Sequence, residues 1–68
     1  MKPFDVVALL EDLPADGLLR GQVGTVVETL APCVFEVEFC DNDGKTYASL
    51  SLPEKQLLVL HLEAVEAA

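Results

Sequence analysis

The segment Asp41-Asn42-Asp43-Gly44 carries the side chains best suited to chemistry, because alternating carboxylates can gather around a hard cation such as calcium. The spacing does not fit an EF-hand loop, which needs glycine at its sixth position and glutamate at its twelfth. Those positions hold Thr46 and Leu52. Asn and Gly tolerate the left-handed backbone of tight turns. We therefore predict a turn here and no bound metal.

The two cysteines and the single histidine form no recognisable catalytic or metal-binding pattern. Cys33 and Cys40 flank one predicted strand, whose seven steps of about 3.3 Å separate them by about 23 Å, too far for a disulfide. His61 has no closely spaced Cys or His partner for a structural zinc site. A nucleophilic cysteine needs a neighbouring base, and a meeting of His61 with either cysteine stays open as an alternative. We predict free thiols, no cofactor and no catalytic residue.

Three glutamates, Glu28, Glu36 and Glu38, are predicted to share the outer face of one hairpin. Like charges opposite one another destabilise a sheet by a few tenths of a kcal/mol or more. Three interpretations follow from this repulsion. The side chains are solvated, or a cation such as Arg20 neutralises them, or they bind a basic partner. An exposed sheet face offers no burial that would adapt carboxyl groups to acid–base catalysis. We expect a protein that is not an enzyme.

A chain of 68 residues has room for one domain and buries only about 60% of its unfolded surface. Domains this small usually need disulfides, a metal or self-association to supplement the core. The first two have no support in this sequence, and 51% of the residues are hydrophobic. Since surplus apolar surface is typical of an interface, we expect a homo-oligomer.

The net charge of −8 includes only four cations, Lys2, Arg20, Lys45 and Lys55. Such a surface repels nucleic acid phosphates and anionic lipids, which favours a basic protein as any charged partner. We expect no nucleic acid, no membrane and no small-molecule substrate. The N-terminal segment lacks a signal-peptide pattern, and no run of about 18 apolar residues could span a bilayer. A reduced, cytoplasmic location is the expectation.

Short apolar runs separated by turn residues predict an all-β fold. The expected strands are Asp5 to Leu10, Val23 to Leu30, Val34 to Phe39, Thr46 to Leu52 and Leu57 to Leu62. A long loop, residues 11–21, follows the first strand, and Leu13, Leu18 and Leu19 are its expected plugs into the core. Gly24 is the expected site of a β-bulge, and residues 53–56 are expected to form a single helical turn.

The strand from Val34 to Phe39 has the clearest period-two alternation in the chain. Phe35, Val37 and Phe39 are predicted to face the core, and Glu36 and Glu38 to face outward. Cys40 shares the outward phase.

Nearly the whole chain resembles the small bacterial proteins grouped as domain of unknown function 4926. The resemblance is carried by Asp5-Val-Val-Ala-Leu, Arg20-Gly-Gln-Val-Gly-Thr-Val-Val-Glu and Leu52-Pro-Glu-Lys-Gln-Leu. It implies a small SH3-like barrel of about five antiparallel strands over residues 1–62, with residues 63–68 as a tail. The family is similar to KOW-type modules and to the barrel of the nitrile hydratase β subunit. It implies no particular activity.

An apolar patch is the strongest functional signal of the sequence. If Val7 and Leu9 point inward, then Val6, Ala8 and Leu10 point outward on the first strand. On the last strand either Leu57 and Val59 or Leu58, Leu60 and Leu62 are left outside. The two strands are neighbours in SH3-like barrels, so the resemblance implies one continuous surface, unless residues 11–19 or the tail cover it.

These observations favour a non-enzymatic interaction module that self-associates through Val6, Ala8, Leu10, Leu58, Leu60 and Leu62 and binds a protein partner. A nucleic-acid-binding barrel of KOW type, which would use the turn at Arg20 and Gly21, is one alternative. An acidic neutraliser of a basic protein, of the antitoxin or immunity kind, is another.

Overall fold

The computed structural model describes residues 1–61 and Ala64, and it contains five antiparallel strands in one sheet. The strands are β1 (Val6–Leu9), β2 (Val23–Ala31), β3 (Val34–Cys40), β4 (Thr46–Pro53) and β5 (Leu57–Val59). Two single-turn 3-10 helices, η1 (Pro14–Asp16) and η2 (Glu54–Gln56), lie between strands. The sheet order is β4-β3-β2-β1-β5. The predicted all-β, barrel-like fold with a helical turn before the last strand is confirmed.

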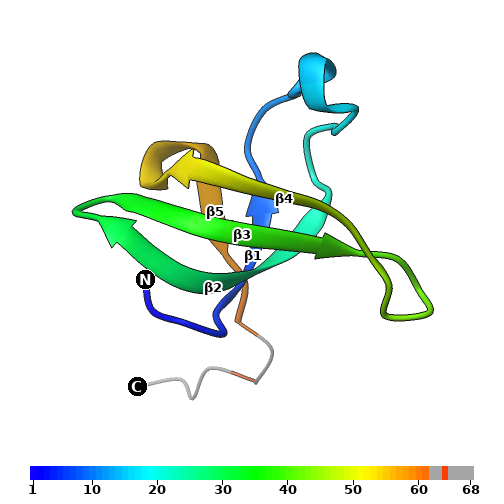
Figure 1. The fold of residues 1–68 in the computed structure, drawn as a ribbon. Helices are drawn as coiled ribbons and strands as arrows, with labels where there is room; N and C mark the ends of the chain where they lie inside the picture. Colours follow the sequence, from blue (N-terminus) through cyan, green and yellow to red (C-terminus); the bar gives the residue numbers. More distant parts are fainter. Residues whose placement is uncertain (62–63, 65–68) are drawn as a thin grey trace.

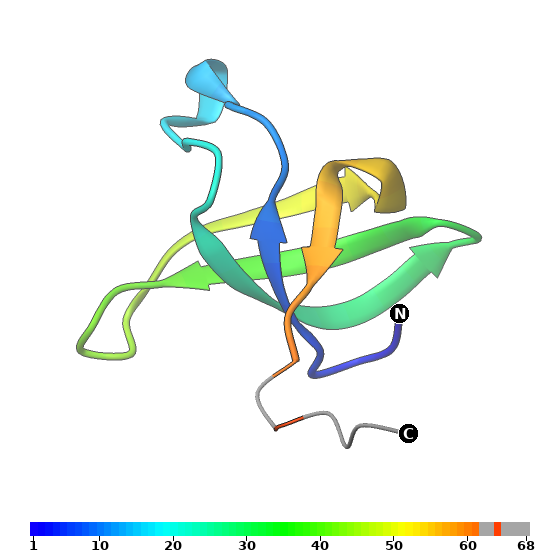
Figure 2. The same ribbon diagram turned by 180° about the vertical axis from the view of Figure 1, so that it is seen from behind.

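Strand β2 belongs to both halves of the sheet. Its first residues pair with β1 and the remainder pairs with β3, with register shifts after Val26 and after Thr29. Each shift increases the local bend and twist of the strand. Consequently β1 and β5 cross behind β3 and β4 in Figure 1 and lie in front of them in Figure 2. The sheet folds over itself and encloses the core between its two halves.

The core is built from side chains of every strand and one loop. The buried cluster consists of Val7, Leu9, Leu18, Val26, Phe35, Val37, Phe39, Leu52 and Leu57. Phe35, Val37 and Phe39 are 5%, 0% and 0% exposed, so the predicted facing of β3 is confirmed. Val7 and Leu9 point inward, as expected.

Gly24 is a point of close packing rather than the predicted bulge. Its pairing with Val7 is regular, and the shifts of β2 come later. A Cβ atom at Gly24 would lie 2.7 Å from Cγ1 of Val37 and 2.9 Å from both the Glu38 carbonyl oxygen and Cδ2 of Phe39. Gly24 is buried and Val23 exposed, so β2 keeps its alternation here without an inserted residue.

The loop between β1 and β2 is anchored by Leu18, which is fully buried, and by Leu13, which is partly buried. Leu13 and Leu18 exchange backbone hydrogen bonds (2.9 and 3.1 Å), and Leu18 is 1% exposed while Leu13 is partly buried against the core. Leu19 is 62% exposed, so its predicted role as a plug is wrong. Adjacent residues of an extended segment point to opposite sides, so Leu19 faces solvent because Leu18 faces the core. The loop ends in a turn at Gly21 (φ 90°), whose N–H donates to the Leu9 carbonyl oxygen (2.8 Å).

The last strand is shorter than predicted, since β5 ends at Val59. One further backbone hydrogen bond, from the Leu60 N–H to the Val6 carbonyl oxygen (2.8 Å), keeps Leu60 beside β1. Leu62 lies outside the described residues, as does the predicted tail apart from Ala64.

Candidate interaction surface

An apolar row crosses three neighbouring strands on the outer side of the sheet. Ala8 of β1 is paired with Val23 of β2 on one side and with Leu58 of β5 on the other. Directly opposed residues of antiparallel strands have Cβ atoms about 4.5–5.5 Å apart, so the three side chains are contiguous. Val23 and Leu58 are 47% and 51% exposed, and Ala8 is 9% exposed. We call these three residues the apolar row.

The other predicted interface residues lie around this row. Val6 is paired with Thr25, and Leu60 lies beside Val6 through their backbone hydrogen bond; both side chains are partly buried. Leu10 is 43% exposed, and its N–H donates to the Gln56 carbonyl oxygen (2.9 Å). The structure therefore brings the two predicted strand surfaces together, and it selects the set containing Leu58 as the outward one. Their role in association stays a prediction.

Two details of this surface differ from the sequence expectation. Ala8 points outward but is almost covered, because its small side chain lies between two longer ones of the apolar row. Val23 belongs to the surface and was not among the predicted residues. The signal that could have identified it is Gly24, which has no side chain and can approach the core closely. An inward Gly24 places Val23 outward.

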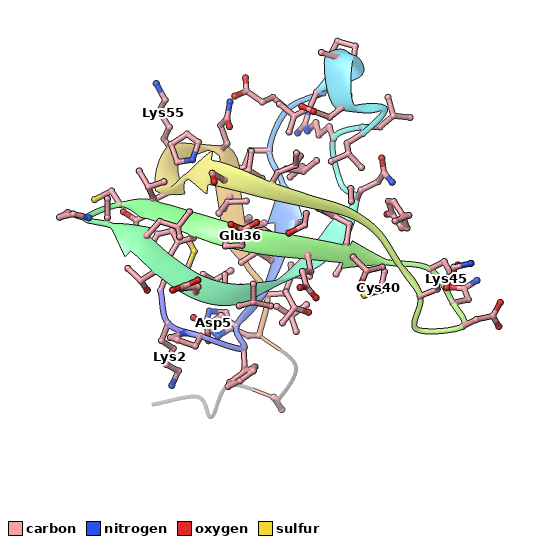
Figure 3. The ribbon with its side chains drawn as sticks, in the orientation of Figure 1. Lys2, Asp5, Glu36, Cys40, Lys45 and Lys55 are labelled. Atoms are coloured by element: carbon pink, nitrogen blue, oxygen red, sulfur yellow. The ribbon has the colours of Figure 1, made fainter. Side chains whose placement is uncertain are left out.

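The three predicted glutamates share the outer face of β2 and β3, and we call them the acidic stripe. Glu28 and Glu36 are directly paired, and Glu38 is paired with Thr25. Glu36 accepts a hydrogen bond from the Ser49 hydroxyl of β4 (2.7 Å). Glu28 is exposed, and Glu36 and Glu38 are partly buried. Figure 3 shows Glu36 in the middle of β3, in the layer in front of β1 and β5. Thr25 lies two residues after Val23 on the same outer face of β2 and is paired with Glu38. The acidic stripe therefore begins beside the Val23 end of the apolar row and continues over β3 and the second half of β2.

The cations lie apart from one another. Lys2, Lys45 and Lys55 are found at three separate margins of the molecule in Figure 3. Arg20 is exposed in the loop before β2, and its backbone N–H donates to Oδ1 of Asp12 (2.8 Å). The turn at Arg20 and Gly21 is therefore held by hydrogen bonds from its backbone N–H groups to Asp12 of the same loop and to Leu9 at the end of β1.

The turn at residues 41–44 is organised by its own carboxylate. Oδ1 of Asp41 accepts hydrogen bonds from the N–H groups of Asp43 (2.9 Å) and Lys45 (3.0 Å), and Gly44 has a φ of 80°. The predicted turn is confirmed. Within residues 1–61 and at Ala64, no group of three or more His, Cys, Asp or Glu side chains is arranged to hold a metal ion.

The thiols and the histidine are all at the surface. Cys33 and Cys40 are free and exposed, and Cys40 Sγ lies 3.4 Å from Oγ1 of Thr46. His61 is exposed beyond the end of β5. In the part of the chain that the structure describes, no helix is long and apolar enough to cross a membrane.

Together these features define a small, acidic, all-β domain with five antiparallel strands. The family model described as Domain of unknown function (DUF4926) matches residues 4–59, so this chain belongs to that family. The membership expected from the sequence is confirmed. Neither a curated protein nor a solved structure matches this chain.

Proposed function

We propose that this protein is a non-enzymatic interaction module that self-associates through the outer side of β2, β1 and β5. The apolar row is the observation that supports this proposal. Apolar residues scattered singly over a surface are ordinary, whereas contiguous ones on neighbouring strands are typical of association sites. Leu10 and Leu60 extend the same surface along the strands.

The size of the domain supports the same proposal. A chain of 68 residues has a small core, and burying Leu58 and Val23 against a second copy removes further apolar area from water. The simplest arrangement is a two-fold dimer, in which the same patch of each copy faces the other. The charge of −8 repels a second copy most strongly where carboxylates meet, and Ala8 and Leu58 of the apolar row lie on β1 and β5, which the sheet order separates from Glu36 and Glu38 of β3 by β2.

Light scattering coupled to size-exclusion chromatography tests the proposal. We expect the wild-type protein to have a dimer mass at tens of micromolar and Leu58→Glu to have a monomer mass. Leu58 is half exposed, so this substitution should leave the thermal melt of the monomer intact. Leu19→Glu is the matched control, because it places the same charge on an exposed leucine that is not part of the apolar row. A monomeric wild type, or a dimer that survives both Leu58→Glu and Leu10→Glu, would refute the proposal.

A protein partner of basic character is the second part of the proposed function. The net charge of −8 and the acidic stripe support it, because opposite charges accelerate encounter and select partners. The separation of Lys2, Lys45 and Lys55 supports a protein over a nucleic acid, since phosphate recognition uses clustered cations.

A further inference from the structure

Among residues 1–61, strand β4 forms one margin of the sheet and pairs with β3 alone, which leaves one backbone edge free. Strand β4 is eight residues long, whereas β5 at the other margin has three. Among the described residues, the backbone hydrogen bonds outside the strand ladders include none from residues 46–53. Figure 1 shows β4 next to β3, on the side of β3 that faces away from β2. Every second residue of such an edge directs its N–H and C=O away from the sheet.

This edge lacks the features that usually protect an exposed strand. Residues 46–52 contain no charged side chain and no proline, and the register shift of the β3–β4 pair lies at its first residues only. Native domains protect long edges with lysines, prolines, bulges or a covering loop, because unpaired backbone groups accept further strands. The part of β4 between this shift and Pro53, residues 48–52, is therefore unprotected and suited to strand addition.

The two faces of β4 have different chemistry. On the outer face Ser49 and Ser51 are exposed and are paired with Glu38 and Glu36 of β3. Serine side chains are short, and strands lie about 4.8 Å apart. A lysine or arginine on a strand added to β4 can therefore extend over the serines to these carboxylates. On the inner face Ala48 and Leu50 are partly buried at the margin of the core.

We propose that β4 accepts an extended segment of a protein partner in which basic and apolar residues alternate. The backbone of the segment hydrogen-bonds to the free edge of β4. Its basic side chains pair with Glu36 and Glu38 across the serines, and its apolar side chains pack beside Ala48 and Leu50. This inference rests on the proposed role as a protein-interaction module, but it uses a different surface from the apolar row.

The experiment is a titration of isotope-labelled protein with the capped peptide Lys-Val-Lys-Val-Lys-Val-Lys, followed by amide NMR. We expect shift changes concentrated in β4 and slower hydrogen exchange of its outward amides. A peptide of the same composition with its lysines and valines in separate blocks is the control, since it has the charge without the alternation. Equal binding of the block peptide, or shifts away from β4 and the acidic stripe, would overturn the inference.

Variants test each part of the proposed site. Ser49→Lys/Ser51→Lys should abolish binding by placing charge on the edge, whereas Ser49→Ala/Ser51→Ala should retain it. Glu36→Gln/Glu38→Gln should weaken binding about fivefold, the effect expected for the loss of two ion pairs at the protein surface. Glu54→Gln/Glu11→Gln removes the same charge from exposed positions outside the strands and should have little effect. Equal affinities of the two glutamine variants would overturn the assigned charge pairing.

The oligomeric state separates this inference from the proposed self-association. Leu58→Glu should bind the peptide as the wild type does, because it alters only the apolar row. If the wild type is a monomer and binds the peptide, only the proposed self-association is refuted. If the wild type is a dimer and does not bind the peptide, only this inference is refuted. If Ser49→Lys/Ser51→Lys instead turns a dimer into a monomer, the occupant of the β4 edge is a second copy, and the inference is wrong.

Discussion

Glu28 of β2 and Glu36 of β3 lie directly opposite each other on the outer face of the sheet. Glu36 also accepts the Ser49 hydroxyl hydrogen bond, which holds its carboxylate in place over β3 and β4. Glu28 is exposed and has only the like charge as its cross-strand neighbour. Like charges in this position destabilise a sheet, so the pair lowers the stability of the isolated domain.

Glu28→Lys should therefore stabilise the protein, by about 0.5 kcal/mol at low salt, because it replaces a repulsive pair with an attractive one. Denaturant titration at low and high salt measures the change, which should shrink as salt screens the exposed charges. Glu11→Lys is the control, since it makes the same change in net charge on an exposed loop residue. An equal gain from Glu11→Lys would show that net charge, not the pairing, is responsible.

Phe39→Ala should leave little folded protein at room temperature. Phe39 is 0% exposed, and truncating a buried phenylalanine costs about 3–5 kcal/mol, comparable to the whole stability of a core of this size. Phe4→Ala is a matched control, because Phe4 is 79% exposed and the substitution removes the same atoms. Thermal melts followed by circular dichroism separate the two. Similar melts for both variants would mean that β3 is not the centre of the core.

The sequence predicted the strands well where one face is apolar and the other charged. Phe35, Val37 and Phe39 alternate with Glu36 and Glu38, and a single register satisfies that pattern. Uniformly apolar runs carry no such information. On β5 the choice between Leu57 and Leu58 as the buried residue depends on pairing with β1, which only the folded chain supplies.

The sequence predicted two of the three residues of the apolar row. Ala8 and Leu58 follow from the alternation of two strands, but Val23 requires that Gly24 face the core. A glycine has no hydropathy preference that would indicate its facing. The free edge of β4 could not be predicted, because it depends on the strand order of the whole sheet. The residues from Thr46 to Leu52 do not by themselves indicate which strands pair with them.

Gly24→Ala should destabilise the protein by about 1–3 kcal/mol, the usual cost of overpacking a core. The added methyl group would lie 2.9 Å from the Glu38 carbonyl oxygen, a backbone atom that cannot move without disturbing β3. Thr25→Ala, at the adjacent partly buried position, should change the melting temperature less. A melting temperature for Gly24→Ala equal to that of the wild type would show that β2 and β3 can separate without cost.

Nucleic acid should not bind at low micromolar concentrations. The chain has a net charge of −8, and Lys2, Lys45 and Lys55 lie at separate margins. Fluorescence anisotropy with labelled single-stranded and double-stranded oligonucleotides at low salt measures this. Micromolar affinity that falls steeply as salt increases would reveal a basic contact surface and would favour the KOW-type alternative.

Cys33→Asn should raise the melting temperature by a few degrees. Cys33 follows Pro32 in the two-residue connection between β2 and β3 and has a φ of 63°. That left-handed conformation costs an ordinary residue about 1–2 kcal/mol, whereas Asn tolerates it. The backbone cannot easily leave it, because the Cys33 carbonyl oxygen accepts a hydrogen bond from the Glu54 N–H (2.8 Å). Cys33→Ser removes the thiol without favouring the left-handed region and should melt as the wild type does. If Ser and Asn stabilise equally, the thiol itself is unfavourable at this turn and the backbone conformation is not the cause.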